Sequence, residues 1–215
     1  MSERLRFIVL GNTANVKSSK RILGRYKDVV ELRDVFEVSR LKKQARKLLI
    51  FKVVDSVDED TWYLISFDIK EVIGRRSGRP RYATKEYTII KDRMFWNLCG
   101  RIDNSTYICP KDSSDIPREF TNYVSVWPVV PYDNKTLNAM KSSVEEALVY
   151  VKLQLMLQLT KIRKEEVHGR AREKARKLVR RAETLLRTPW ISKVERLLDR
   201  KIVLSEVEEL KKTIS

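Results

Sequence analysis

The sequence predicts an α+β protein in which a sheet-containing segment precedes a helical C-terminal region. Short apolar runs rich in β-branched and aromatic residues recur up to residue 133, and turn residues separate them. From residue 134 onward Gly and Pro almost disappear, apart from Gly169 and Pro189, and apolar residues recur at helical spacing. We therefore expect an α+β domain over residues 1–133 and a helical, basic region over residues 134–215.

Apolar runs in the first segment predict its strands, and the stretches between them predict two helices and a loop. The strand candidates are Phe7–Leu10, Leu48–Val54, Trp62–Ile69, Asn104–Pro110 and Asn122–Asp133. A basic helix is expected at Arg40–Lys47 and a second helix at Lys85–Cys99. The Gly- and Arg-rich stretch Gly74–Arg81 predicts a flexible loop.

A long helix is expected at the start of the C-terminal region, with a capping box formed by Ser142 and Glu145 or by Ser143 and Glu146. One apolar stripe recurs at helical spacing through Val144, Leu148, Val151, Leu155, Leu159 and Ile162. Further apolar residues lie on other faces, at Val149, Leu153, Met156 and Leu157. Because a helix that is apolar on nearly all sides must be buried, we expect Val144–Leu159 to pack inside this domain or against a partner subunit.

The overall charge points to a polyanionic partner. The chain has 45 Lys and Arg against 29 Asp and Glu, which gives a net charge of +16. Nucleic acid is the first candidate partner and an anionic membrane surface the second. Since no apolar run approaches the ~18 residues of a membrane span, and the N-terminus does not resemble a signal peptide, we expect a cytoplasmic protein that does not enter a membrane.

Cys99 and Cys109 are the only thiols, and with a single His they offer no metal-binding spacing. We expect both to be ordinary buried thiols. A disulfide between them would fit a hyperthermophilic host, which three Gln in 215 residues and abundant Lys, Arg and Glu weakly suggest.

The segment Gly11–Ser18 follows the first strand candidate and partly matches a phosphate-binding loop. Gly11, Lys17 and Ser18 fall on the first Gly, the Lys and the Ser of that pattern. Val16 stands where the second Gly should be, and a β-branched residue resists the backbone turn that surrounds the anion. We therefore expect no nucleotide to bind there, although Lys17 and Ser18 can still meet a backbone phosphate.

Four cationic clusters are the candidate binding surfaces: Lys17–Lys27, Arg40–Lys47, Arg75–Arg81 and Lys161–Arg187. The last holds eleven Lys and Arg against four Glu, and helical spacing spreads its cations over a wide face. A merely solvated helix is the alternative, because the Glu residues can pair with Lys or Arg one turn away. The expected phosphate contacts are Arg75, Arg76, Arg79, Arg81, Lys161, Arg163, Lys164, Arg170, Arg172, Lys174, Arg176, Lys177, Arg180 and Arg181. We expect Trp62, Trp96, Trp127 and Trp190 to pack in the core.

Residues 60–130 resemble a known family on short motifs. The strand Trp62–Ile69 reaches an aspartate, Asp68, near its end; an Arg-containing loop and a helix follow, and then Arg101 precedes the run Ser105-Thr106-Tyr107. This order is similar to the ferredoxin-like domain of the small CRISPR adaptation subunit and of phenylacetate-type repressors. The loop after Asp68 is longer and richer in Gly than in those families, and the next helix is less basic. The resemblance implies a βαββαβ fold and a nucleic-acid partner.

In family members described as nucleases, the equivalent of Asp68 is a metal ligand, paired across a dimer. One carboxylate cannot build a Mg or Mn site alone, so a symmetric dimer or a second acid would be needed. Asp68 can equally be a structural residue that caps the following turn.

We therefore expect a non-catalytic nucleic-acid-binding protein that uses no cofactor and contacts the phosphate backbone through its basic helix and loop, with DNA and RNA both open. The first alternative is a divergent metal-dependent nuclease that uses Asp68 with Mg or Mn. The second is an adaptor subunit of a larger assembly, or a homodimer, formed through Val144–Leu159.

Overall fold

The computed structural model describes residues 5–10, 29–32, 49–69, 71–73, 80–82, 84–103, 105–112, 116, 118–164 and 169–214. Several predicted features lie outside these residues. They are the phosphate-loop pattern at Gly11–Ser18, the basic clusters Lys17–Lys27 and Arg40–Lys47, and the loop arginines Arg75, Arg76 and Arg79. The predictions made for them stay predictions.

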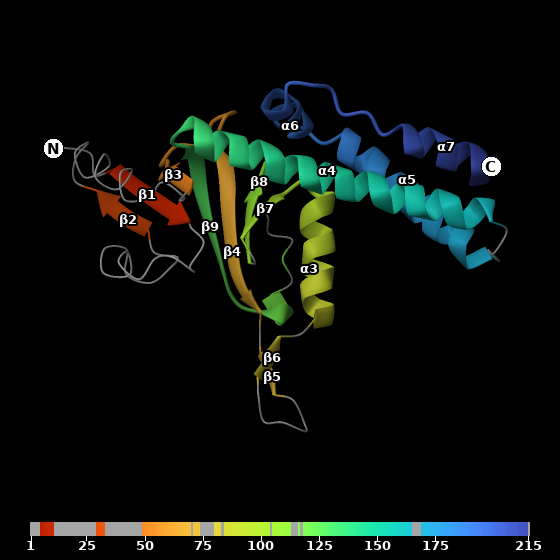
Figure 1. Ribbon diagram of the computed structural model, residues 1–215, viewed down its shortest axis with the longest axis horizontal. Helices are drawn as coiled ribbons and strands as arrows, with labels where there is room; N and C mark the ends of the chain where they lie inside the picture. Colours follow the sequence, from red (N-terminus) through yellow and green to blue (C-terminus); the bar gives the residue numbers. More distant parts are fainter. Residues whose placement is uncertain are drawn as a thin grey trace.

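A curled seven-stranded sheet forms the centre of the molecule (Figure 1). Its strand order is β2-β1-β3-β9-β4-β8-β7, and every neighbouring pair is antiparallel. The strands are β1 (Leu5–Leu10), β2 (Val29–Leu32), β3 (Leu49–Val53), β4 (Trp62–Ile69), β7 (Gly100–Asp103), β8 (Thr106–Cys109) and β9 (Thr121–Pro131). All five predicted strands are found, and the α+β class is confirmed.

The central strand β4 is buried on both faces, which explains its nearly continuous apolar sequence. Successive side chains of a strand point to opposite faces. Accordingly, Trp62 and Leu64 join one hydrophobic cluster, whereas Ile65, Phe67 and Ile69 join another. The second cluster is filled by helix α3 (Thr84–Trp96), which the sequence predicted within three residues at each end.

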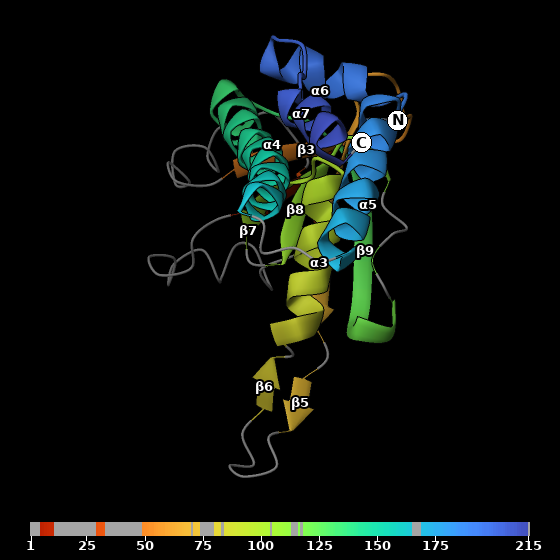
Figure 2. The same ribbon diagram turned by 90° about the vertical axis from the view of Figure 1, so that its right-hand side faces the viewer.

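A small antiparallel ribbon projects from the far end of β4 (Figures 1 and 2). It consists of β5 (Glu71–Ile73) and β6 (Pro80–Tyr82), with Val72 opposite Arg81. The prediction of a loop over the whole of Gly74–Arg81 is therefore wrong at its end, because Pro80 and Arg81 belong to β6. Pro can open an edge strand, since its missing N–H is not needed there.

The helical C-terminal region is confirmed and contains α4 (Asn134–Arg163), α5 (Gly169–Leu186), α6 (Ile191–Leu198) and α7 (Ser205–Ile214). Helix α4 lies across one end of the sheet, and α5 runs back beside it (Figure 1). One hydrophobic cluster contains residues of β1, β3, β4 and β9 and of all four of these helices. The sheet and the helical region therefore share a core.

The predicted capping box for α4 is wrong, because the helix begins about two turns earlier. Asp133 is the N-cap: its carboxylate accepts hydrogen bonds from the Thr136 backbone N–H at 2.8 Å and from the Thr136 hydroxyl at 2.7 Å. The Thr136 hydroxyl in turn accepts from the Ile50 backbone N–H at 3.0 Å, which fixes the helix start to β3. Ser143 lies inside the helix, and its hydroxyl donates to the Ala139 carbonyl at 2.8 Å.

Helix α4 is buried along the predicted stripe and exposed on its opposite side. The buried residues include Val144, Leu148, Val151, Leu155 and Leu159. The four other apolar residues remain about half exposed. The first alternative for Val144–Leu159, packing inside this domain, is therefore correct for the buried stripe, whereas Val149, Leu153, Met156 and Leu157 face away from the core.

Gly100 at the start of β7 lies directly against the backbone of α4. A Cβ atom added there would lie 2.6 Å from the Ser143 carbonyl carbon and 2.7 Å from the Val144 nitrogen. Since both atoms belong to a helix backbone, neither can move away as a side chain could. Only Gly allows the edge of the sheet to approach α4 this closely.

We predict that Gly100→Ala lowers the free energy of unfolding by about 1–3 kcal/mol, because the methyl group overpacks a rigid contact. The matched control is Gly169→Ala at the start of α5, where a Cβ would meet nothing within 4 Å. It should change stability by less than about 1 kcal/mol, toward greater stability. Urea unfolding of both variants measures the difference, and equal stabilities would show that β7 can move away from α4.

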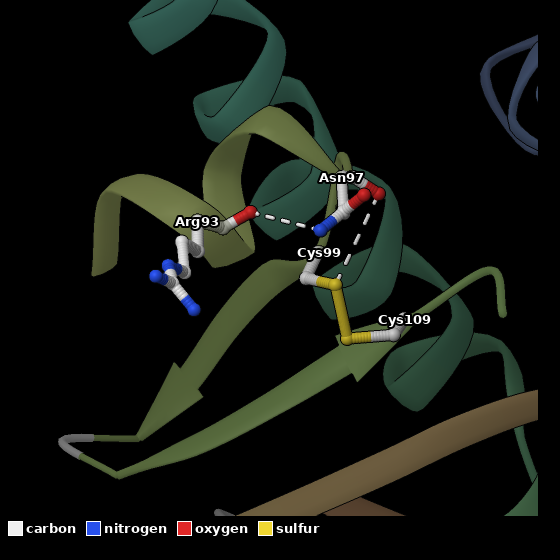
Figure 3. The surroundings of a disulfide bond; sticks show 4 residues. All are labelled: Arg93, Asn97, Cys99 and Cys109. Carbon is white, nitrogen blue, oxygen red and sulfur yellow. Dashed lines mark hydrogen bonds between the residues drawn. A yellow bond between two sulfur atoms is a disulfide. The ribbon is translucent and has the colours of Figure 1, made fainter. Parts of the chain in front are cut away.

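Cys99 and Cys109 form a disulfide, so the expectation of two free thiols is wrong (Figure 3). The helix predicted to reach Cys99 ends at Trp96, because Leu98 adopts a left-handed conformation with φ of 51°. The Cys99 N–H then donates to the Met94 carbonyl at 3.0 Å. Because Gly100 pairs with Ile108 in the β7–β8 hairpin, Cys99 lies directly opposite Cys109, with their Cα atoms 4.2 Å apart.

We predict that reducing this disulfide lowers the free energy of unfolding by about 3 kcal/mol, as the chain-entropy account gives for a loop of this size. Urea unfolding of oxidised and reduced protein measures the loss. The double variant Cys99→Ala/Cys109→Ala is the control and should not respond to reductant. Alkylation of both thiols in urea without reductant would contradict the disulfide.

Candidate nucleic-acid interface

Helix α5 presents a cationic surface because its apolar residues all face inward. Ala175, Val179, Ala182 and Leu185 are buried against the rest of the helical region. Leu178 and Leu186 pack partly buried against the same cluster, and the spacing of these residues leaves the opposite side of the helix to solvent. The exposed side chains include Arg172, Lys174, Arg176, Lys177 and Arg180.

Acidic partners neutralise only some of the predicted binding residues. Lys177 pairs with Glu173 one turn away at 2.7 Å, and Arg163 pairs with Glu209 of α7 at 3.0 Å. Only the Lys177–Glu173 pair is of the one-turn kind that the alternative of a merely solvated helix expects, and that alternative stays a prediction. Among the predicted binding residues whose side chains the structure describes, six have no ion pair: Lys161, Lys164, Arg172, Lys174, Arg176 and Arg180.

The acids of α5 are already occupied. Glu173 binds Lys177, and Glu183 binds Lys211 of α7 at 2.8 Å. In each case the hydrogen bond from the lysine is the largest cause that lowers the pKa of the carboxyl group. Both acids therefore stay charged at neutral pH and cancel the charges of their own partners. Neither acid of α5 therefore forms an ion pair with Arg172, Lys174, Arg176 or Arg180.

Arg181 is held in a network that joins three helices. Its guanidinium donates to Asp92 of α3 at 2.8 Å and lies over the ring of Trp96, 4.5 Å from the ring centroid. Asp92 also accepts a hydrogen bond from the hydroxyl of Tyr150 of α4 at 3.1 Å. This network connects α3, α4 and α5, so Arg181 has a structural role.

An open cleft of about 410 Å³ lies between α3 and the C-terminal half of α5. Its walls are Arg93, Trp96, Asn97, Arg181, Thr184, Leu185, Thr188 and Trp190. Trp62 and Trp96 are buried and Trp127 and Trp190 pack partly buried against the same cluster, as the sequence predicted. The prediction did not include a second role for Trp190, whose ring also lines this cleft. No local signal indicates it, because the cleft forms only when α5 folds back onto α3.

The remaining predicted residues lie at two separate places. Lys161, Arg163 and Lys164 are exposed at the C-terminal end of α4. Arg170 lies in the first turn of α5, and Arg81 lies in β6. The ribbon that carries Arg81 projects away from α5, with α3 between them (Figures 1 and 2). The structure therefore groups the α4 and α5 cations in one region and leaves the ribbon apart.

Asp68 lies inside the sheet, one residue before the end of β4. It is half-buried and opposite Tyr123, where the β4–β9 register shifts between Asp68 and Ile69. Among the described residues, no group of three His, Cys, Asp or Glu side chains could hold a metal ion. None of the helices in that part of the chain is long and apolar enough to cross a membrane.

Comparison with known proteins assigns neither a family nor a function to this chain. No family model, no curated protein and no solved structure matches the chain.

We predict that the burial of Tyr150 beside Asp92 makes the free energy of unfolding fall as the pH rises through the alkaline range. Burial, followed by the charge of Asp92, raises the pKa of Tyr150 from 10.0 to about 12. The folded state therefore holds its proton longer than the unfolded state, and the resulting stability is present below pH 10 and is lost as the pH rises toward about 12. The slope is at most about 1.4 kcal/mol per pH unit, reduced by solvent screening.

Tyr150→Phe should flatten this dependence, while costing about 1 kcal/mol at neutral pH for the lost hydrogen bond. Unfolding in urea at several pH values between 8 and about 12 measures both effects for the two proteins. If the two proteins lose stability equally across this range, the Tyr150 hydroxyl does not couple to folding.

Proposed function

We propose that this protein is a non-catalytic nucleic-acid-binding protein that holds the phosphate backbone on the outer face of α5. The observation that carries the proposal is the set of exposed cations on that helix which no acid neutralises, namely Arg172, Lys174, Arg176 and Arg180. Lys161 and Lys164 add positive charge at the adjoining end of α4. A net charge of +16 gives the whole molecule the same sign.

The chemistry of this surface suits phosphate rather than bases. Arg presents several donors in a planar fork that matches phosphate oxygens. Arg172, Arg176 and Arg180 follow one another at single-turn spacing, so they line one flank of the helix over about 12 Å. Phosphate contacts carry no sequence information. We therefore infer binding that depends strongly on salt and weakly on sequence.

The sheet supports the proposed ferredoxin-like relationship. Strands β9-β4-β8-β7 are adjacent and antiparallel, and α3 connects β4 to β7. A βαββαβ chain places its fourth strand beside its first in the same way. The second helix of that order has no counterpart among the described residues between β8 and β9, where a short 3₁₀ turn lies at Arg118–Phe120. The nuclease and adaptor alternatives stay predictions. Among the described residues, Asp68 belongs to no group of three or more side chains that could hold a metal ion.

We predict that changing Arg172, Arg176 and Arg180 together to Gln makes the log–log salt dependence of binding shallower by about 2–3 units, if each arginine meets one phosphate. Gln nearly preserves helix propensity. Affinity should fall about equally for unrelated sequences. Fluorescence anisotropy from about 50 to 300 mM salt, on two unrelated duplexes, one single strand and one RNA, measures slope and affinity.

The control variant removes three cations from other elements, with Lys52 of β3, Lys85 of α3 and Lys212 of α7 changed to Gln. Both variants lose the same net charge. If the control weakens binding as much as the α5 variant, net charge and not α5 is responsible. If neither variant changes the slope, the α5 surface does not bind nucleic acid.

A further inference from the structure

The side of α4 that faces away from the core carries an apolar stripe. Val149, Leu153, Met156 and Leu157 are 47%, 49%, 50% and 55% exposed. These residues follow the i, i+4, i+7, i+8 spacing of a single helix face. The helix that carries them is anchored by its opposite, fully buried stripe. An apolar stripe on the uncovered side of an anchored helix is a candidate interaction surface.

Opposite charges stand at the two ends of this α4 stripe. Glu146 is exposed one turn before Val149, and Lys164 is exposed two turns after Leu157. Neither has an ion pair within the described part of the chain, whereas the neighbouring Glu145 binds Arg200 and Arg163 binds Glu209. The face is therefore acidic, then apolar, then basic along the helix.

We propose that the exposed apolar stripe of α4 pairs with the same exposed stripe of a second copy of this chain, in antiparallel orientation. In a register that sets Leu153 opposite Leu157 of the other copy, the residue seven positions before Leu153 meets the residue seven positions after Leu157. These residues are Glu146 and Lys164. The two-fold symmetry repeats every contact, so one register forms two leucine pairs and two ion pairs.

The charge pattern selects this partner over others. A parallel pair would place Glu146 beside Glu146 and Lys164 beside Lys164, which like charges oppose. An anionic membrane surface would attract Lys164 and repel Glu146. A phosphate backbone would repel Glu146 and has no apolar surface for Leu153 and Met156. An antiparallel second copy satisfies the apolar centre and both charged ends.

The contact is small, and its strength is limited accordingly. From Glu146 to Lys164 the face is about 27 Å long at 1.5 Å per residue. A standard stable interface buries roughly 800 Å² on each partner, which one helix face does not supply. We therefore expect a reversible dimer with a dissociation constant in the micromolar range.

Sedimentation equilibrium of the full chain over about 1–300 μM, a range chosen to span that affinity, tests the proposal. Leu153→Glu should raise the dissociation constant at least tenfold. Glu146→Lys and Lys164→Glu should each raise it severalfold, because each places like charges together. The double variant Glu146→Lys/Lys164→Glu should restore the wild-type value, since it exchanges the charges within each pair.

Val203→Glu is the control, because Val203 is also an exposed apolar residue, 65% exposed, outside α4. It should leave association unchanged. The circular dichroism of every variant should match the wild type, since the altered side chains are exposed. A monomeric wild type throughout this range overturns the proposal, as does a double variant that associates no better than the two single variants. Binding of the wild type to anionic vesicles that Leu153→Glu abolishes, without self-association, would assign the stripe to a membrane instead.

Discussion

The close contact between the edge of the sheet and α4 determines where the other helices can lie. Gly100 lets β7 approach the α4 backbone at Ser143, and Asp133 and Thr136 tie the start of the helix to β3. Helix α4 also contacts β8, β9, α3, α5, α6 and α7. The buried side of α4 continues from Thr136 to Leu159, and the C-terminal half of the helix, which extends beyond the sheet, packs against α5 and α7.

The polar contacts between elements use acidic residues that would otherwise offset the positive charge. Asp92 holds Arg181, Glu145 holds Arg200, Glu209 holds Arg163 and Glu183 holds Lys211. Lys193 of α6 donates to the carbonyls of Thr61 and Pro110, and burial lowers its pKa. The chain has 29 Asp and Glu against 45 Lys and Arg. Each acid that forms a structural ion pair is unavailable to the remaining Lys and Arg, so some of these residues have no acidic partner. On α5 such residues gather on one outward face.

Residue patterns predicted the strands and helices whose formation depends on residues close together in the sequence. Alternation and continuous apolar runs placed β4, β8 and β9, and helical spacing placed the buried stripe of α4. The errors have local physical causes. Leu98 takes a left-handed conformation usually reserved for Gly, so α3 ended earlier than predicted, and Cys99 came to lie opposite Cys109. The Asp92–Arg181–Trp96 network and the cleft beside it join α3 to α5 across long sequence separation, which no local pattern records.

The two exposed surfaces of the helical region have different chemistry because the core constrains them differently. Helix α5 turns Ala175 and Ala182 inward, and these short side chains let it pack closely against its neighbours. Its long Arg and Lys side chains are then carried outward on a backbone that is already ordered, so a phosphate contact need only order side chains. Helix α4 has apolar residues outside its buried stripe. These residues are exposed on the opposite side of the helix, between Glu146 and Lys164, which have no ion pair among the described residues. Excess charge on one helix and excess apolar area on the other are thus the observations on which the two proposed partners rest, an anionic polymer for α5 and a second copy of the chain for α4.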